Sequence, residues 1–211
     1  MMNDEPAVMS GQHIRAILDE LRSDVDTAFS NLDNSPTSQS GRRDVLNAVI
    51  NYLDTARTLL FRLAQIRERK QPFNIHKRSI LIAFESNSDN ATQLEERLRP
   101  PSWEQSISGM FVPATIFSRV ETQEFSPSRK VSNDLATLAS ARARLLAPRT
   151  PSSLQITKQE LLSASRTITW VHAKAHELLM VASESPAQEL ERRLKLRDLY
   201  DLKIFDQLHG G

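Results

Sequence analysis

Apolar residues recur along three long segments of the chain at alternating steps of three and four residues. The first series is Ile14, Leu18, Leu21, Val25, Ala28 and Leu32, the second is Val45, Val49, Tyr52, Ala56, Leu59, Leu63 and Ile66, and the third is Leu161, Ala164, Ile168, Val171, Ala175, Leu178 and Ala182. A mean step of 3.5 residues keeps each series on one side of a helix, as in a helical bundle or coiled coil. The pattern therefore predicts three long amphipathic helices.

Turn-forming residues bound these helices. The polar segment 33–41 predicts a loop short enough to join the first two helices as an antiparallel hairpin. Pro72 ends the second helix, because proline lacks an N–H donor and disfavours helical geometry in the residue before it. Thr157 is the predicted N-cap of the third helix, with Glu160 as its capping-box partner and with Ile156 and Leu161 as a hydrophobic staple.

The period is lost between Pro72 and Pro127. Short apolar runs lie in segments 79–84 and 110–117, and they fit either strands or buried helical turns, of which we favour helical turns. Two capping-box patterns predict short helices near 91–99 and 103–109. An alanine-rich helix is then predicted over 132–147.

The last predicted helix, over about 186–208, is apolar on more than one side. Leu190, Leu194, Ile204, Phe205 and Leu208 share one face, whereas Leu196, Leu199 and Leu202 point elsewhere. A helix that is apolar nearly all round needs cover on two sides. We expect this cover to come from the irregular middle segment or from another chain.

These elements predict an all-α fold, an antiparallel bundle of four to five long helices with an irregular middle segment of short helices. The expected organisation is a disordered N-terminus (1–9), a helical hairpin (10–70), an irregular insertion (71–127) and a C-terminal helical segment (128–211) that completes one bundle domain. A chain of 211 residues is long enough to bury such a core.

Composition narrows the function classes. The chain has no cysteine, which excludes disulfides, thiolate metal ligands and a cysteine nucleophile. The opening residues lack the basic and apolar regions of a signal peptide, and no apolar run approaches the roughly 20 residues that cross a bilayer. We therefore expect an intracellular protein, cytoplasmic or nuclear, without a membrane span.

Charge is unevenly distributed, although the formal net charge is only +1. Residues 1–34 are acidic, while residues 62–78 and 126–150 are basic. A candidate basic patch consists of Arg62, Arg69, Lys70, Lys77 and Arg78. Such a patch can attract nucleic acid. We favour a solvated helix face over nucleic-acid binding, because these stretches lack interleaved aromatic residues and glycine-rich phosphate loops.

Two residues of the third helix carry a family resemblance. Arg166 and His172, with five residues between them, resemble the Arg-x(4–6)-His signature of the HEPN family of small helical ribonucleases. The resemblance implies that this Arg and His act on an RNA 2′-hydroxyl and its scissile phosphate. Thr167 departs from the family pattern, in which a polar amide or an acidic residue commonly follows the Arg.

No metal, cofactor, small-molecule ligand or catalytic residue is predicted. His172 and His176 have the four-residue spacing of zinc ligands on a helix, but Ala-Lys-Ala lies between them in place of a metalloprotease motif. Ser126 begins a Ser-Pro-x-Arg sequence that proline-directed kinases prefer, and it is a candidate phosphorylation site.

The favoured function is a non-enzymatic protein–protein interaction or scaffold subunit of a larger assembly, acting through its C-terminal helix with a protein partner or as a homo-oligomer. Trp170 lies opposite its helix's apolar seam, where it either meets another helix or anchors a contact. The candidate interface residues are Trp170, Leu196, Leu199, Tyr200, Leu202 and Phe205. The alternatives are a helical nucleic-acid-binding or HEPN-like RNA-processing protein, and a viral or phage structural protein.

Overall fold

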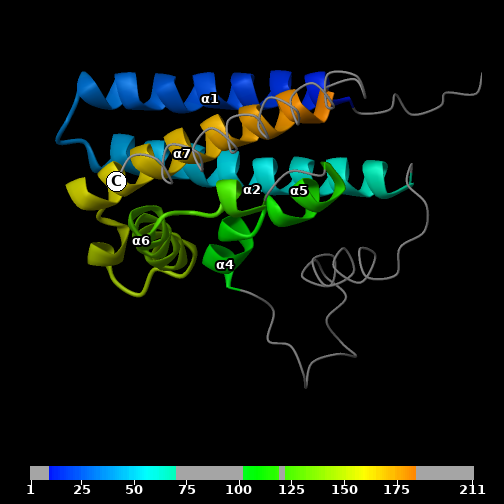
Figure 1. Cartoon of the computed structure of the whole chain (residues 1–211). Coiled ribbons are helices and arrows are strands. Elements are labelled where there is room, and N and C mark those ends of the chain that lie inside the picture. The colour runs from blue at the N-terminus through cyan, green and yellow to red at the C-terminus, as the bar shows by residue number, and fades with distance from the viewer. Residues whose placement is uncertain (1–9, 70–101, 119–121, 184–211) are drawn as a thin grey trace, which may run out of the picture.

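The computed structural model describes residues 10–69, 102–118 and 122–183, and every regular element in these ranges is helical (Figure 1). The elements are α1 (Gly11–Asp33), α2 (Gln39–Arg69), α4 (Trp103–Ser108), α5 (Val112–Ser118), η1 (Thr122–Phe125), α6 (Arg129–Leu146), η2 (Pro151–Leu154) and α7 (Lys158–Ser183). The predicted all-α helical bundle is confirmed. The predictions for 1–9, 79–84, 91–99 and 186–208 lie outside the described residues.

Three long helices form the centre of the bundle. In Figure 1, α1 and α2 run antiparallel, and α7 lies alongside both. The shorter helix α6 is seen nearly end-on in the same view, so it crosses α1 and α2 steeply. It packs on α7 and α4. Helices α4 and α5 both contact α2, and α5 also reaches α7.

The predicted seams form the core of this arrangement. Ile14, Leu18 and Val25 of α1 are fully buried. Most seam positions of α2 and α7 are also fully buried. These fully buried residues are Val45, Val49, Tyr52, Ala56, Ala164, Ile168, Val171, Ala175 and Leu178. These side chains belong to one continuous hydrophobic cluster, apart from Val45, which is buried outside it. Burial of these apolar side chains is the main stabilising contribution, about 1.5–3 kcal/mol for each large one.

Local capping fixes where the helices begin. Thr157 caps α7 as predicted: its hydroxyl accepts the Glu160 N–H (3.2 Å), and the Glu160 carboxylate accepts the Thr157 N–H (2.7 Å). The predicted helix 103–109 is also confirmed, as α4, with Ser102 and Gln105 forming its capping box.

Two predicted boundaries were wrong by a few residues. Helix α6 begins at Arg129 and not at 132, because Ser128 is its N-cap and accepts the Val131 N–H (3.4 Å). The predicted loop 33–41 is too long, because α2 already begins at Gln39, where the Ser38 hydroxyl accepts the Gly41 N–H (3.0 Å). In both cases a serine caps a polar first turn that shows no apolar period.

The apolar run at 110–117 is helical, as favoured from the sequence. Met110 and Phe111 are buried in the turn between α4 and α5. The rest of the run, residues 112–117, belongs to α5. Among the described helices, none has the length and hydropathy required to cross a membrane.

Candidate functional site

A cluster of three potential ligand groups lies between α1 and α7. Asp19 projects from α1, and His172 and His176 lie one turn apart on α7. The Oδ1 atom of Asp19 is 2.6 Å from His176 Nε2 and 3.8 Å from His172 Nε2. The two imidazole ring centroids are 4.3 Å apart. Ligand atoms of all three residues lie within 4.8 Å of one another.

Tyr52 of α2 supports this cluster from the core side. Its hydroxyl shares a hydrogen bond of 2.9 Å with His172 Nδ1, and its ring is fully buried. Burial raises the pKa of the Tyr52 hydroxyl well above its ordinary value, so the group is protonated at neutral pH. The contact fixes the orientation of the His172 ring and turns Nε2 toward Asp19.

The surroundings of His172 favour its neutral form. Burial lowers the pKa of His172, and the charges of neighbouring His176 and Arg22 lower it further. The Nε2 atom of His176 is shielded from solvent and makes no hydrogen bond within the described part of the chain, although the Asp19 carboxylate is close.

Arg166, one residue of the HEPN-like pair, forms hydrogen bonds outside the cluster of Asp19, His172 and His176. Its Nε donates to Oδ2 of Asp134 on α6 (2.7 Å), and its Nη2 donates to Oδ1. Ser163 also donates to Oδ1 (2.8 Å). The bond from Arg166 lowers the pKa of the Asp134 carboxyl, against the opposing effect of burial. Arg166 therefore faces α6, whereas His172 contacts Tyr52 and Asp19 on α2 and α1.

Trp170 meets another segment of the chain. Its ring is edge-on to Phe111, with ring centroids 5.6 Å apart and an interplanar angle of 89°. It is half-buried and packs against the hydrophobic core. Part of the Trp170 surface is therefore buried by contacts within the chain. Its role in an interface stays a prediction.

Of the remaining sequence candidates, the structure describes the side chains of Arg62 and Ser126. Arg62 is exposed on α2, and Ser126 is exposed after η1, where its hydroxyl donates to the Thr122 carbonyl (3.3 Å). The Arg69 side chain and the other candidates lie outside the described residues: Lys70, Lys77, Arg78, Leu196, Leu199, Tyr200, Leu202 and Phe205.

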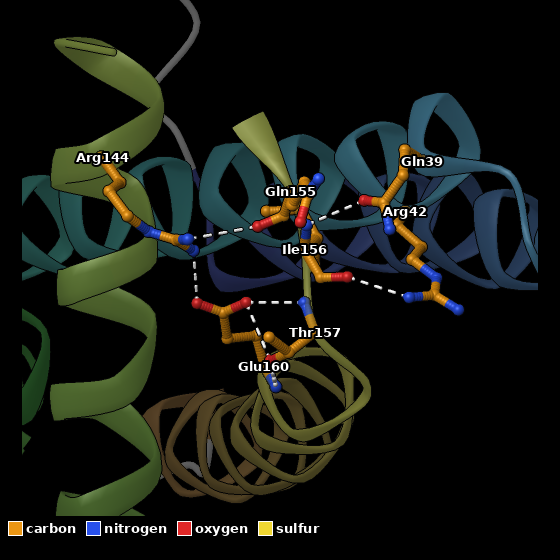
Figure 2. A network of polar contacts seen from close by, with 7 residues as sticks. All are labelled: Gln39, Arg42, Arg144, Gln155, Ile156, Thr157 and Glu160. Carbon is orange, nitrogen blue, oxygen red and sulfur yellow. Dashed lines mark hydrogen bonds and ion pairs between the residues drawn. The ribbon is translucent and has the colours of Figure 1, made fainter. Parts of the chain in front are cut away.

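A second polar network joins α6, α7 and the start of α2 (Figure 2). Arg144 of α6 forms an ion pair with Glu160 and donates to the Gln155 carbonyl (3.2 Å). Glu160 is the same residue that caps α7. The network therefore holds the start of α7 against α6.

The other end of this network reaches α2. The N–H of Ile156 donates to the Gln39 side-chain oxygen (2.8 Å), and the Ile156 carbonyl accepts from Arg42 (3.0 Å). Figure 2 shows both contacts on the extended segment before α7. Backbone groups outside the helices are satisfied here by side chains, so this network is structural.

The sequence alone did not identify Asp19, Tyr52 or Asp134 as residues of these polar clusters. The spacing of His172 and His176 was visible, but Asp19 lies 153 positions earlier in the chain and fits the solvated side of an amphipathic helix. Tyr52 occupies an ordinary core position of its seam. Asp134 resembles a residue of a polar first turn, and it becomes informative only when α6 packs against Ser163 and Arg166.

Comparison with known proteins gives no match to a family model, to a curated protein or to a solved structure.

Proposed function

We propose that this chain is a non-enzymatic interaction or scaffold subunit that assembles with further copies of itself through its C-terminal segment. The observation that carries the proposal is the surplus of apolar residues in the sequence of 186–208: in the predicted helix, Leu196, Leu199 and Leu202 fall outside the face of Leu194 and Phe205. The seams of α1, α2 and α7, by contrast, pack against one another.

Charge supports a second copy as the partner. Segment 186–197 carries four basic and two acidic residues, and segment 198–208 carries three acidic residues and one basic residue. Two copies of this predicted helix, packed antiparallel, would place the basic half of each copy beside the acidic half of the other. A two-fold pair of this kind is self-complementary, as the interfaces of symmetric dimers are.

Substitution of two leucines tests the location of the interface. Leu199→Glu combined with Leu202→Glu should reduce the mass in solution, measured by light scattering, because each carboxylate would be buried in an apolar contact. The matched control is Leu146→Glu with Leu162→Glu. These leucines are 68% and 53% exposed on α6 and α7, so the control adds the same charge without the predicted loss of mass.

Charge reversal tests the antiparallel arrangement. Arg193→Asp and Asp201→Arg should each weaken self-association, because each places like charges opposite one another. The two changes combined in one chain should restore it. Unchanged association in both single variants would exclude the antiparallel pairing.

The geometry gives no comparable support to RNA cleavage, because Arg166 is held by Asp134 and His172 by Tyr52. That function stays a prediction of the sequence. Its test is loss of ribonuclease activity in Arg166→Ala combined with His172→Ala.

A further inference from the structure

Asp19, His172 and His176 combine the features of a metal-binding site. The cluster contains two imidazoles on one face of α7 and one carboxylate on α1, with all three ligand atoms within 4.8 Å. We infer that these three residues bind one divalent transition-metal ion, with zinc as the probe, and that the ion joins α1 to α7. This site is independent of the proposed self-assembly.

The donor set matches the chemistry of such ions. Zinc is bound in proteins by histidine nitrogen and carboxylate oxygen, and three protein ligands with one open position form a common arrangement. Imidazole also suits copper, nickel and iron. Calcium and magnesium prefer oxygen ligands, so the two histidines disfavour them.

The two separations that involve Asp19 are close to those around a bound zinc ion. A tetrahedral zinc ion with bonds of about 2.0–2.1 Å holds its ligand atoms about 3.3 Å apart. The separations from Asp19 Oδ1 to the two Nε2 atoms, 2.6 and 3.8 Å, lie on either side of this value. The Asp19 side chain is half-exposed on a helix surface, so it can rotate without disturbing the core.

Tyr52 supplies the outer contact that histidine ligands commonly have. When Nδ1 of His172 carries the ring proton, it donates to the Tyr52 hydroxyl oxygen, and the lone pair of Nε2 faces Asp19. Such outer hydrogen bonds fix the ring orientation and the tautomer of a ligand. Tyr52 is thus a positioning residue.

Two further features favour a bound cation. His176 Nε2 is shielded from solvent with the Asp19 carboxylate oxygen 2.6 Å away, so a metal ion between them would bond to both groups. Arg22, a positive charge one turn further along α1, is paired with Asp26 at 2.9 Å. That pairing reduces its repulsion toward a cation.

Titration calorimetry of the full chain with zinc chloride, in a buffer without chelating groups, tests the inference. The expected result is one ion per chain. Asp19→Asn, His172→Gln and His176→Gln should each reduce the affinity by more than about a hundredfold, and Tyr52→Phe by about tenfold, the range found for outer contacts. His13→Gln is the matched control. Glutamine keeps the capping box with Ser10, so the affinity should not change.

A second measurement does not depend on variants that must fold. In NMR spectra of the wild-type chain, zinc should shift the ring signals of His172 and His176 and leave those of His13 in place. Absence of zinc binding would mean that the cluster is an ion pair only, and it would overturn the inference. Zinc binding that survives in all three ligand variants, or equal shifts at His13, would overturn it as well.

Discussion

Asp134 of α6 and Arg166 of α7 are joined by two hydrogen bonds, from Nε and Nη2 of the guanidinium to the two carboxylate oxygens. The Asp134 side chain is only 5% exposed, and Ser163 donates a third bond to it. The buried Asp134 carboxylate therefore joins α6, the helix that crosses the bundle, to α7, one of the central helices.

Loss of the Asp134 charge should destabilise the fold. We expect Asp134→Asn to lower the free energy of unfolding by about 2 kcal/mol, because a charge-assisted pair is replaced by an amide that also presents N–H donors to Arg166. Urea denaturation measures the change. Asp26→Asn is the matched control: its pair with Arg22 is solvent-exposed and should contribute less than about 1 kcal/mol. Equal losses in both variants would contradict the assignment.

The same carboxylate predicts a pH dependence. The pKa of Asp134 is lowered in the folded chain by its bond to Arg166, so its stabilising contribution is complete above the ordinary Asp pKa of about 3.9. This contribution is lost as the pH falls through the lowered value. The difference in unfolding free energy between wild type and Asp134→Asn should therefore stay constant near neutral pH and shrink in acid. A difference that grows in acid would have the wrong sign.

The segment before α7 provides a third prediction. Gln39→Ala removes the acceptor for the N–H of Ile156, a residue only 1% exposed, and should cost about 1–2 kcal/mol of stability. Gln155→Ala is the control, since the contact of Gln155 with Arg144 uses its backbone carbonyl. Thermal denaturation of the two variants gives the comparison. A similar melting temperature for both would mean that Gln39 does not hold this segment.

Phe111 gives a fourth prediction. It is buried between the rings of Trp170 and Phe125, so Phe111→Ala should leave a cavity and cost about 3–5 kcal/mol. Leu146→Ala, at a position 68% exposed, should change the unfolding free energy by less than about 0.5 kcal/mol. Chemical denaturation distinguishes them. A small loss for Phe111→Ala would show that the turn between α4 and α5 is not part of the core.

The sequence predicted the long helices well because their signal is local. A regular step of three and four residues identified the seams of α1, α2 and α7, and the Thr157 capping box fixed the start of α7. The starts of α2 and α6 were less accurate. Their first turns are polar and depend on single hydroxyl groups, Ser38 and Ser128.

The site was less predictable because its members come from three helices. His172 and His176 share one helix, but the approach of Asp19 and Tyr52 depends on how α1 and α2 pack against α7. Likewise, nothing in the sequence indicated that Arg166 is paired with an aspartate 32 positions away. Periodicity predicts which face is buried, but it does not predict which polar groups meet across that face.

Sedimentation equilibrium of the wild-type chain over a range of concentrations tests the proposed self-assembly most directly. The expected mass rises with concentration to at least twice the 23.9 kDa of one chain, and it returns toward 23.9 kDa in Leu199→Glu combined with Leu202→Glu. A single 23.9 kDa species at every concentration of the wild type would contradict it.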